Sequence, residues 1–231
     1  MSLLRTFIAV EIPPHVQKQI QQVTEPLRKA IGSSLVRWVP AQNIHLTLKF
    51  LGDVSPASVD ILTQMLRAEA DSCPAFDLQI SGLGSFPSLK RPRVLFLGIQ
   101  APAELEALNR GIESACARLG YESEGRDFHP HLTLGRVKQD ASALDQQKIR
   151  RALEEQKIDS LGTARVNSVH LYKSDLKPTG SVYTQIYSAP LKQSPCHCEE
   201  RSSRRSNHHS ARRLLRANAL ATTYHIKRGE T

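Results

Sequence analysis

The sequence has little that would tie it to a membrane or to an export route. Its 231 residues contain no run of about 18 apolar residues, the length that a membrane-spanning helix requires. The first residues, MSLLRTFIAVEIPP, include an Arg and a short apolar run, but they lack the long apolar core and the small-residue cleavage site of a secretory signal. We therefore expect a cytoplasmic protein that has no membrane partner.

Cysteine is also scarce, which argues against a disulfide framework. The four cysteines are irregularly spaced: Cys73, Cys116, Cys196 and Cys198. The Cys196-His197-Cys198 segment could begin a zinc site that His208 and His209 would complete. However, only one residue separates the two thiols, and no second pair of cysteines follows. We expect neither a metal nor a cofactor.

Acidic residues are outnumbered, and the excess of positive charge is concentrated near the carboxyl terminus. The formal net charge is +9. Residues 192–231 contain nine Lys or Arg and three Asp or Glu, a net charge of +6, whereas residues 1–191 are only mildly basic. Because this last segment is also polar and almost free of aromatic residues, we predict one folded domain over residues 1–191 and a basic, disordered tail over 192–231. A tail that binds RNA phosphates is the alternative.

The hydrophobic pattern of the first 191 residues predicts alternating strands and helices. We expect strands at 4–11, 36–39, 43–50, 76–86, 93–100, 130–137, 163–176 and 181–191, with 76–86 and 93–100 paired as a hairpin. We expect helices at 15–32, 55–70, 102–119 and 142–156, the second with Ser55 as its N-cap.

The tetrapeptide His-Leu-Thr-Leu occurs twice, at residues 45–48 and 131–134. Each copy lies in a predicted strand that a helix and then a pair of strands follow, which indicates an internal duplication of one lobe. Side chains alternate between the two faces of a strand. We therefore expect His45, Thr47 and Lys49 on one face of the first strand, and Phe50 in the core on the other face.

In the second copy the same alternation places His131 and Thr133 on one face and the two leucines on the other. If an approximate two-fold axis relates the copies, the four polar side chains line one cleft. Two histidines in opposite protonation states can act as general acid and general base without a metal. The threonine hydroxyls suit phosphate oxygens, and Arg136 can balance the negative charge of a transition state. A symmetric metal site and a duplicated core motif are the alternatives.

These motifs and their flanks resemble the two-histidine phosphoesterases, and within them the bacterial and archaeal RNA 2',3'-cyclic phosphodiesterases, once called 2'-5' RNA ligases. The resemblance covers about residues 4–191 and rests on segments that include HLTLKF, HLTLGR, RTFIAVEIP and GLGSFPSLKRPRVLFLGI. It implies a bilobal α+β fold in which two antiparallel sheets line a central cleft and the helices lie outside. The copy of the motif that contains His131 is preceded by His129, where relatives often carry Arg.

The resemblance implies hydrolysis of the 2',3'-cyclic phosphate at an RNA 3' end to a 2'-phosphate, without a metal. By analogy, His45 protonates the leaving 3' oxygen and His131 activates water, while Thr47, Thr133 and Arg136 bind the phosphate. The partner is then RNA with a cyclic phosphate end, with tRNA fragments among the candidates, and the protein is expected to be monomeric. The alternatives are ligation or cleavage of a 2'-5' linkage, a cyclic nucleotide substrate, and an RNA-end binder without activity.

Two aromatic residues beside the motifs could stack on a terminal base. Parity favours the core for Phe50, whereas Phe128 precedes its strand and its position stays open. The sequence alone does not decide which histidine is the proton donor.

Overall fold

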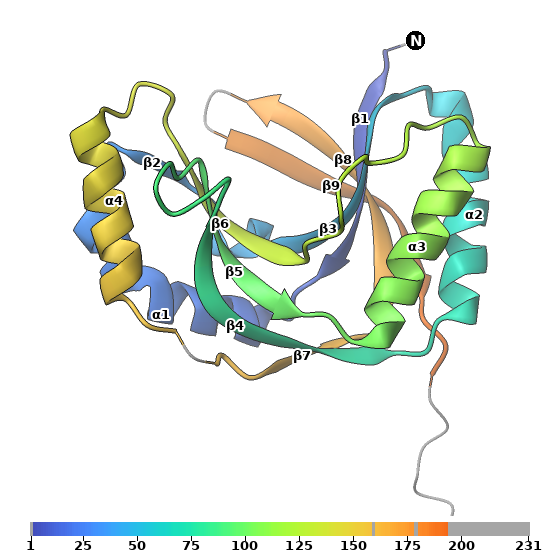
Figure 1. Ribbon diagram of the computed structural model, residues 1–231. Coiled ribbons are helices and arrows are strands. Elements are labelled where there is room, and N and C mark those ends of the chain that lie inside the picture. The colour runs from blue at the N-terminus through green and yellow to red at the C-terminus, as the bar shows by residue number, and fades with distance from the viewer. Residues whose placement is uncertain (1, 159, 178–179, 194–231) are drawn as a thin grey trace, which may run out of the picture. The chain divides into compact units, whose positions relative to one another are not determined.

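A computed structural model describes residues 2–158, 160–177 and 180–193 (Figure 1). The predictions made for the tail, including Cys196, Cys198, His208 and His209, lie outside these residues. No helix in the described ranges is both long enough and apolar enough to span a bilayer. The backbone of Lys192 bridges to Pro74, and the division of the chain at residue 191 stays a prediction.

The secondary structure follows the predicted order, and most bounds lie within two residues of those expected. The helices are α1 (Pro14–Ile31), α2 (Val59–Ser72), α3 (Ala103–Arg118) and α4 (Ala143–Glu155), with 3-10 turns at Ala41–Asn43 and Pro56–Ser58. The strands are β1 (Leu4–Glu11), β2 (Val36–Trp38), β3 (His45–Val54), β4 (Phe76–Phe86), β5 (Val94–Gln100), β6 (His131–Val137), β7 (Thr163–Val166), β8 (Ser168–Lys177) and β9 (Gly180–Pro190). The predicted strand at 163–176 is in fact two strands, because the chain leaves one partner and joins another at Asn167.

Local sequence signals explain where one 3-10 turn and one α-helix begin. The side chain of Ser55 accepts a hydrogen bond from the amide of Ala57, as an N-cap does, although the first turn that it caps is 3-10 rather than α. Ser142 and Asp145 form a reciprocal capping box at the start of α4.

The strands form one antiparallel sheet of nine strands, in the order β7-β4-β5-β6-β3-β1-β8-β9, with β2 also paired to β6. The mixed helix and strand architecture with antiparallel pairing is as predicted, but two separate sheets are not confirmed. Instead, β3 and β6 join two halves through a single register pair, Leu46 with Leu132. Where β3 then leaves β6, β2 takes its place, pairing Val36–Trp38 with Val137–Gly135.

The halves are built by exchange of strands, which differs from the predicted duplication of a self-contained lobe. The hairpin β4-β5 follows the first copy of the motif in the chain, yet it pairs with β6 of the second copy. Likewise, β8 and β9 follow the second copy but extend the half that contains β1 and β3. Each copy of the motif therefore depends on strands that follow the other copy.

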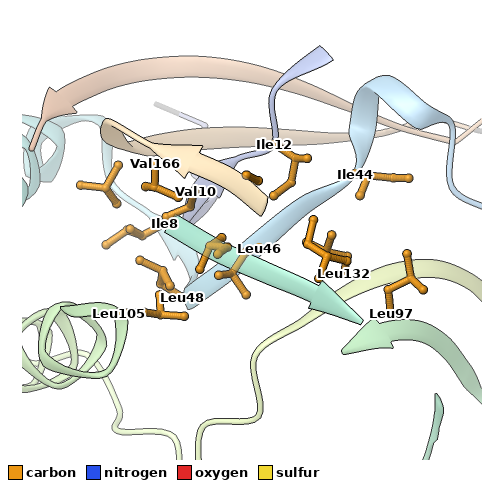
Figure 2. Close-up of a cluster of buried hydrophobic side chains, with 14 of the residues drawn as sticks. Ile8, Val10, Ile12, Ile44, Leu46, Leu48, Leu97, Leu105, Leu132 and Val166 are labelled. Carbon is orange, nitrogen blue, oxygen red and sulfur yellow. The ribbon is translucent and has the colours of Figure 1, made fainter. Parts of the chain in front are cut away.

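Helices cover the sheet in two pairs, α1 with α4 and α2 with α3 (Figure 1). Their apolar faces and the inward side chains of the strands form one buried cluster, part of which is shown in Figure 2. The cluster includes Leu46, Leu48, Leu132 and Leu134, the two leucines of each tetrapeptide. The four leucines thus lie on the buried face, as alternation predicts, and burial of side chains of this size stabilises the fold by roughly 1.5–3 kcal/mol each.

Candidate active site

The repeated motifs meet at the seam between the halves. Because Leu46 pairs with Leu132 in antiparallel register, the same register continued by one residue places His45 opposite Thr133 and Thr47 opposite His131. The two leucines are buried, and all four polar residues are partly exposed. The structure thus brings both predicted histidines and both threonines onto one face.

A β-bulge in each motif strand changes which residues follow on this face. In β3, Thr47 pairs with Ala9 and Lys49 with Ile8, so Leu48 is an extra residue that interrupts the alternation. The predictions for Lys49 and Phe50 are therefore wrong. Lys49 is 1% exposed and points into the interior, whereas Phe50 is 55% exposed and lines the cleft.

The same irregularity occurs in β6. Thr133 pairs with Phe96 and Gly135 with Leu95, so Leu134 is the extra residue. Strict alternation would turn Arg136 toward the leucine face, but the bulge turns it into the cleft, beside Thr133. Phe50 and Arg136 therefore occupy equivalent positions in the two copies, one aromatic and one cationic.

Both histidines are held by the same backbone device. The Nδ1 atom of His45 lies 2.7 Å from the carbonyl oxygen of Asn43, and the Nδ1 atom of His131 lies 2.7 Å from the carbonyl oxygen of His129. Because a carbonyl can only accept, each Nδ1 carries the hydrogen. The Nε2 atoms are consequently the ones that can accept or donate a proton in the reaction.

Aromatic rings fix the imidazoles in place on each side. The His45 ring stacks on Phe7 at a centroid distance of 4.9 Å and meets Tyr183 edge-on at 5.2 Å. The His131 ring meets the edges or faces of Phe86 at 5.0 Å and Phe96 at 5.4 Å. These rings also exclude water from one side of each histidine.

The surroundings lower the pKa of both histidines. Burial is the main cause for His45, the hydrogen bond to Asn43 opposes it, and charge on His131 lowers the pKa further. Burial also dominates for His131, against the hydrogen bond to His129, and the positive charges of Arg136 and His129 lower this pKa as well. Since a proton on His131 disfavours one on His45, the pair is suited to hold a single proton between them.

The cleft is a cavity of about 520 Å³, and its walls hold several residues that sequence reasoning missed. These are Arg5, Phe7, Asn43, Ser181 and Tyr183. The side-chain amide of Asn43 donates to the carbonyl of Ser181 at 3.1 Å, which ties the segment that orients His45 to β9. The only hint in the sequence was position, because Asn43 and His129 each lie two residues before a motif histidine.

The remaining candidates lie elsewhere. His15 is exposed on α1, and His170 is 5% exposed, with its Nε2 atom 3.0 Å from the Ser168 hydroxyl. Phe128 is partly buried and packs against the core. Within the described ranges, no three His, Cys, Asp or Glu side chains are grouped closely enough to hold a metal ion.

Comparisons with known proteins identify the family. The family model of the 2'-5' RNA ligase superfamily matches residues 12–178. The chain is 31% identical to the RNA 2',3'-cyclic phosphodiesterase of Methanothermobacter thermautotrophicus over 79% of this chain and 96% of that protein. It is also 31% identical to the enzyme of the same name from Thermotoga maritima, over 80% of this chain and 94% of that one.

Solved structures agree with these relatives. The crystal structure of E. coli LigT complexed with 3'-AMP superposes with a TM-score of 0.67 at 28% identity, over 83% of this chain and 99% of that one. A crystal structure of a protein from Thermus thermophilus gives a TM-score of 0.68 at 26% identity, over 82% of this chain and 98% of that one. The matched sequence, the two motifs and the fold together place the chain in the 2'-5' RNA ligase superfamily.

Proposed function

We infer that the protein hydrolyses the 2',3'-cyclic phosphate at the 3' end of RNA to a 2'-phosphate, with His45 and His131 as the acid–base pair. The observation that carries this inference is the matched pair of imidazoles, each with its Nδ1 hydrogen bonded to the carbonyl two residues earlier and both facing one cavity. The relatives named RNA 2',3'-cyclic phosphodiesterase support the substrate class.

In the proposed reaction, Nε2 of neutral His131 takes a proton from water while the water oxygen forms a bond to phosphorus. The bond between phosphorus and the 3' oxygen breaks, and Nε2 of protonated His45 gives its proton to that oxygen. The products are a 3'-hydroxyl and a 2'-phosphate, and the two histidines exchange protons with solvent before the next turnover. This is general acid–base catalysis at two positioned groups.

The electrostatics of the cleft support this assignment of roles. The positive charges of Arg136 and His129 disfavour the cationic form of His131, which suits a base. The charged group that lowers the pKa of His45 is His131 itself, so a neutral His131 leaves His45 better able to hold the proton. Burial lowers both pKa values, and the added effect of Arg136 and His129 supports the proposal that His131 is the acceptor.

The other residues of the cleft have roles that match the substrate. The hydroxyls of Thr47 and Thr133 can donate to the non-bridging oxygens, and Arg136 can balance the charge that grows on them. Phe50, exposed beside Phe7 at a centroid distance of 5.9 Å, offers an apolar ring on which the terminal base can stack.

An RNA oligonucleotide that ends in 2',3'-cyclic phosphate tests the proposal when the product isomer is identified by chromatography or NMR. We expect a 2'-phosphate, and we expect kcat to fall by about 10²–10⁴-fold in His45→Ala and in His131→Ala. His15→Ala is the matched control, because His15 is exposed on α1 and should leave kcat unchanged. EDTA should have no effect on the wild-type rate, as expected of chemistry without a metal.

Several results would redirect the assignment. Full activity in either motif variant would refute the acid–base pair, and a 3'-phosphate product would refute the proposed leaving group. Turnover of cyclic mononucleotides alone, or joining of 2'-5' ends, would indicate a different substrate. Tight binding of cyclic-phosphate ends without product on long incubation would indicate an RNA-end binder. Cytoplasmic location, a monomeric state and tRNA fragments as substrates remain part of the proposal.

A further inference from the structure

A second arginine, Arg37, lies beside Arg136 on the neighbouring strand, outside the set of residues that line the cavity. Arg37 is the middle residue of β2, and its Cα pairs directly with that of Arg136 in antiparallel register. Directly paired residues project from the same face of a sheet, and neighbouring strands lie about 4.8 Å apart. Since Arg136 projects into the cleft, Arg37 projects from the same face, one strand further out.

The packing around Gly135 confirms which way β2 faces. A Cβ atom on Gly135 would come within 2.6 Å of Val36 Cγ1 and 3.0 Å of the Trp38 ring. Val36 and Trp38 therefore lie on the face of Gly135, which is buried, and Arg37 between them lies on the opposite face. The orientation of Arg37 is fixed by two packed neighbours.

Three strand segments around the two arginines contain no Asp or Glu: 26–52, 78–103 and 128–139. They contain β2, most of β3 and β4, and all of β5 and β6. Asp53, the residue that follows the first segment, lines the cleft together with Arg136. Among the described residues, neither guanidinium forms an ion pair with a carboxylate. The loop before β5 adds exposed cations at Lys90, Arg91 and Arg93.

We propose that Arg37 binds a backbone phosphate of single-stranded RNA on the 5' side of the nucleotide that reacts. This inference rests on the proposed function, which places the cyclic phosphate between His45 and His131. From that position, β6 leads outward to Arg136, and β2 adds Arg37 beside it. A guanidinium binds a phosphate through two parallel hydrogen bonds, and an arginine that holds no carboxylate is available to do so.

A purely structural role explains Arg37 poorly. Its contribution to the sheet is made by its backbone, which pairs with Arg136. Its exposed side chain contributes nothing to the buried cluster, where Val36 lies instead. Two adjacent cations with no carboxylate between them repel each other, and a bound polyanion offsets this electrostatic repulsion.

The test compares substrates of increasing length in wild type and in Arg37→Ala. The substrates are a 2',3'-cyclic mononucleotide and the di-, tri- and decanucleotides that end in 2',3'-cyclic phosphate. We expect kcat/KM for the decanucleotide to fall about 5- to 30-fold at low salt, as for the loss of one phosphate contact, while the mononucleotide stays within about twofold. The length at which the loss first appears identifies the phosphate that Arg37 binds.

Salt dependence supplies a second readout that a structural defect would not produce. Loss of one phosphate contact should make the plot of log(kcat/KM) against log[KCl] shallower by about 0.7 for a single strand. Arg37→Lys should retain the slope and lose part of the rate, because the charge stays and the two-pronged geometry does not. Arg110→Ala on α3 is the matched control, because it removes the same charge from an exposed side chain that forms an ion pair with Glu106.

Equal losses for mononucleotide and decanucleotide, or no loss for either, would overturn the proposal. Binding of a 2'-phosphate-ended decanucleotide, followed by fluorescence anisotropy, separates this inference from the activity itself. If wild type turns over no substrate yet Arg37→Ala weakens that binding 5-fold or more with a shallower salt slope, the proposed function fails and the phosphate contact stands. If binding is unchanged, the contact is refuted whatever the activity.

Discussion

At the scale of the residue, the two imidazoles of the site, His45 and His131, have similar contacts but different charged neighbours. In each, the Nδ1 atom lies 2.7 Å from the carbonyl oxygen of the residue two positions earlier, and burial lowers the pKa of both imidazoles. The positive charges of Arg136 and His129 act on His131, whereas the equivalent positions in the other copy hold Phe50 and Asn43. In the proposed reaction this difference in charge is what gives the two histidines unequal roles.

Arg136→Gln should therefore shift the pH profile as well as slow the reaction. In wild type, kcat/KM should be bell-shaped and centred below the ordinary histidine pKa of about 6.5, since both pKa values are lowered. The acid limb reports loss of the proton from the base. Removing the positive charge raises the pKa of His131, so this limb should move to higher pH, with kcat about 10²-fold lower.

Arg136→Lys is the control for charge, and it should keep the acid limb where wild type has it. An acid limb that does not move in Arg136→Gln would show that His131 is not the base, or that Arg136 does not act on it. Initial rates on a cyclic mononucleotide between pH 4.5 and 8.5 would measure both limbs.

At the scale of the element, a buried cation links β3 to the segment that leads into β6. Lys49, turned inward by the bulge at Leu48, places its Nζ atom 2.8 Å from a carboxylate oxygen of Glu113 on α3 and 2.6 Å from the carbonyl oxygen of Glu122. That carbonyl belongs to the loop between α3 and His131. One ammonium group thus fixes the start of the chain segment that delivers the second histidine.

Lys49→Met should destabilise the protein by roughly 3 kcal/mol, because it leaves the carboxylate of Glu113 without its buried partner. The double variant Lys49→Met/Glu113→Leu should recover part of this loss, since no charge is then left alone. Urea unfolding followed by circular dichroism measures both. A single variant as stable as wild type, or a double variant less stable than the single one, would contradict the role given to this pair.

The sequence predicts most elements, and it places the two histidines and two threonines of the motifs on one face, where the structure also has them. The roles of these residues stay predictions. The errors at Lys49 and Phe50 share a cause. Helix and strand positions follow from local periodicity, and the repeated His-Leu-Thr-Leu tetrapeptide is visible in the sequence itself. The positions of Lys49, Phe50 and Arg136 depend on an extra residue in each strand, which only the pairing of β3 with β1 and β6 with β5 reveals. Strict alternation has no way to detect this bulge, because Leu48, the extra residue, continues the period-two series of apolar residues that Ile44 and Leu46 begin.

Pairing between segments that lie far apart in the chain also could not be predicted from the sequence. The split of 163–176 into β7 and β8 and the orientation of Asn43 by Ser181 both depend on contacts more than 80 residues apart in the chain. No local pattern encodes them. The position of Arg37 beside Arg136 was unpredictable for the same reason, since it depends on the pairing of β2 with β6.

At the scale of the whole molecule, buried neutral histidines couple stability to pH. Burial lowers the pKa of His45, His131 and His170, with Glu11 opposing the shift at His170. As pH falls below the unfolded value of about 6.5, the unfolded chain takes up protons before the folded protein does. The contribution of these groups is thus fully present above that pH and is lost as pH falls toward the folded-state pKa values.

We therefore expect the free energy of unfolding to decrease between pH 7.5 and 5.5, and to decrease less in His170→Gln. His170 is the suitable site, because it lies outside the catalytic cleft and its neutral partner is the Ser168 hydroxyl. Urea titrations at four pH values give the slope. An identical slope in the variant would remove His170 from the set of groups responsible, whereas a flat wild-type profile would contradict the coupling as a whole.

The exchange of strands between the halves has a consequence for how the chain can be divided. A cut near residue 74, between α2 and β4, separates the two motifs in sequence, but it leaves β1 and β3 without β8 and β9, and β5 and β6 without β2. Neither fragment contains a complete half, so the two halves have no independent existence as folding units.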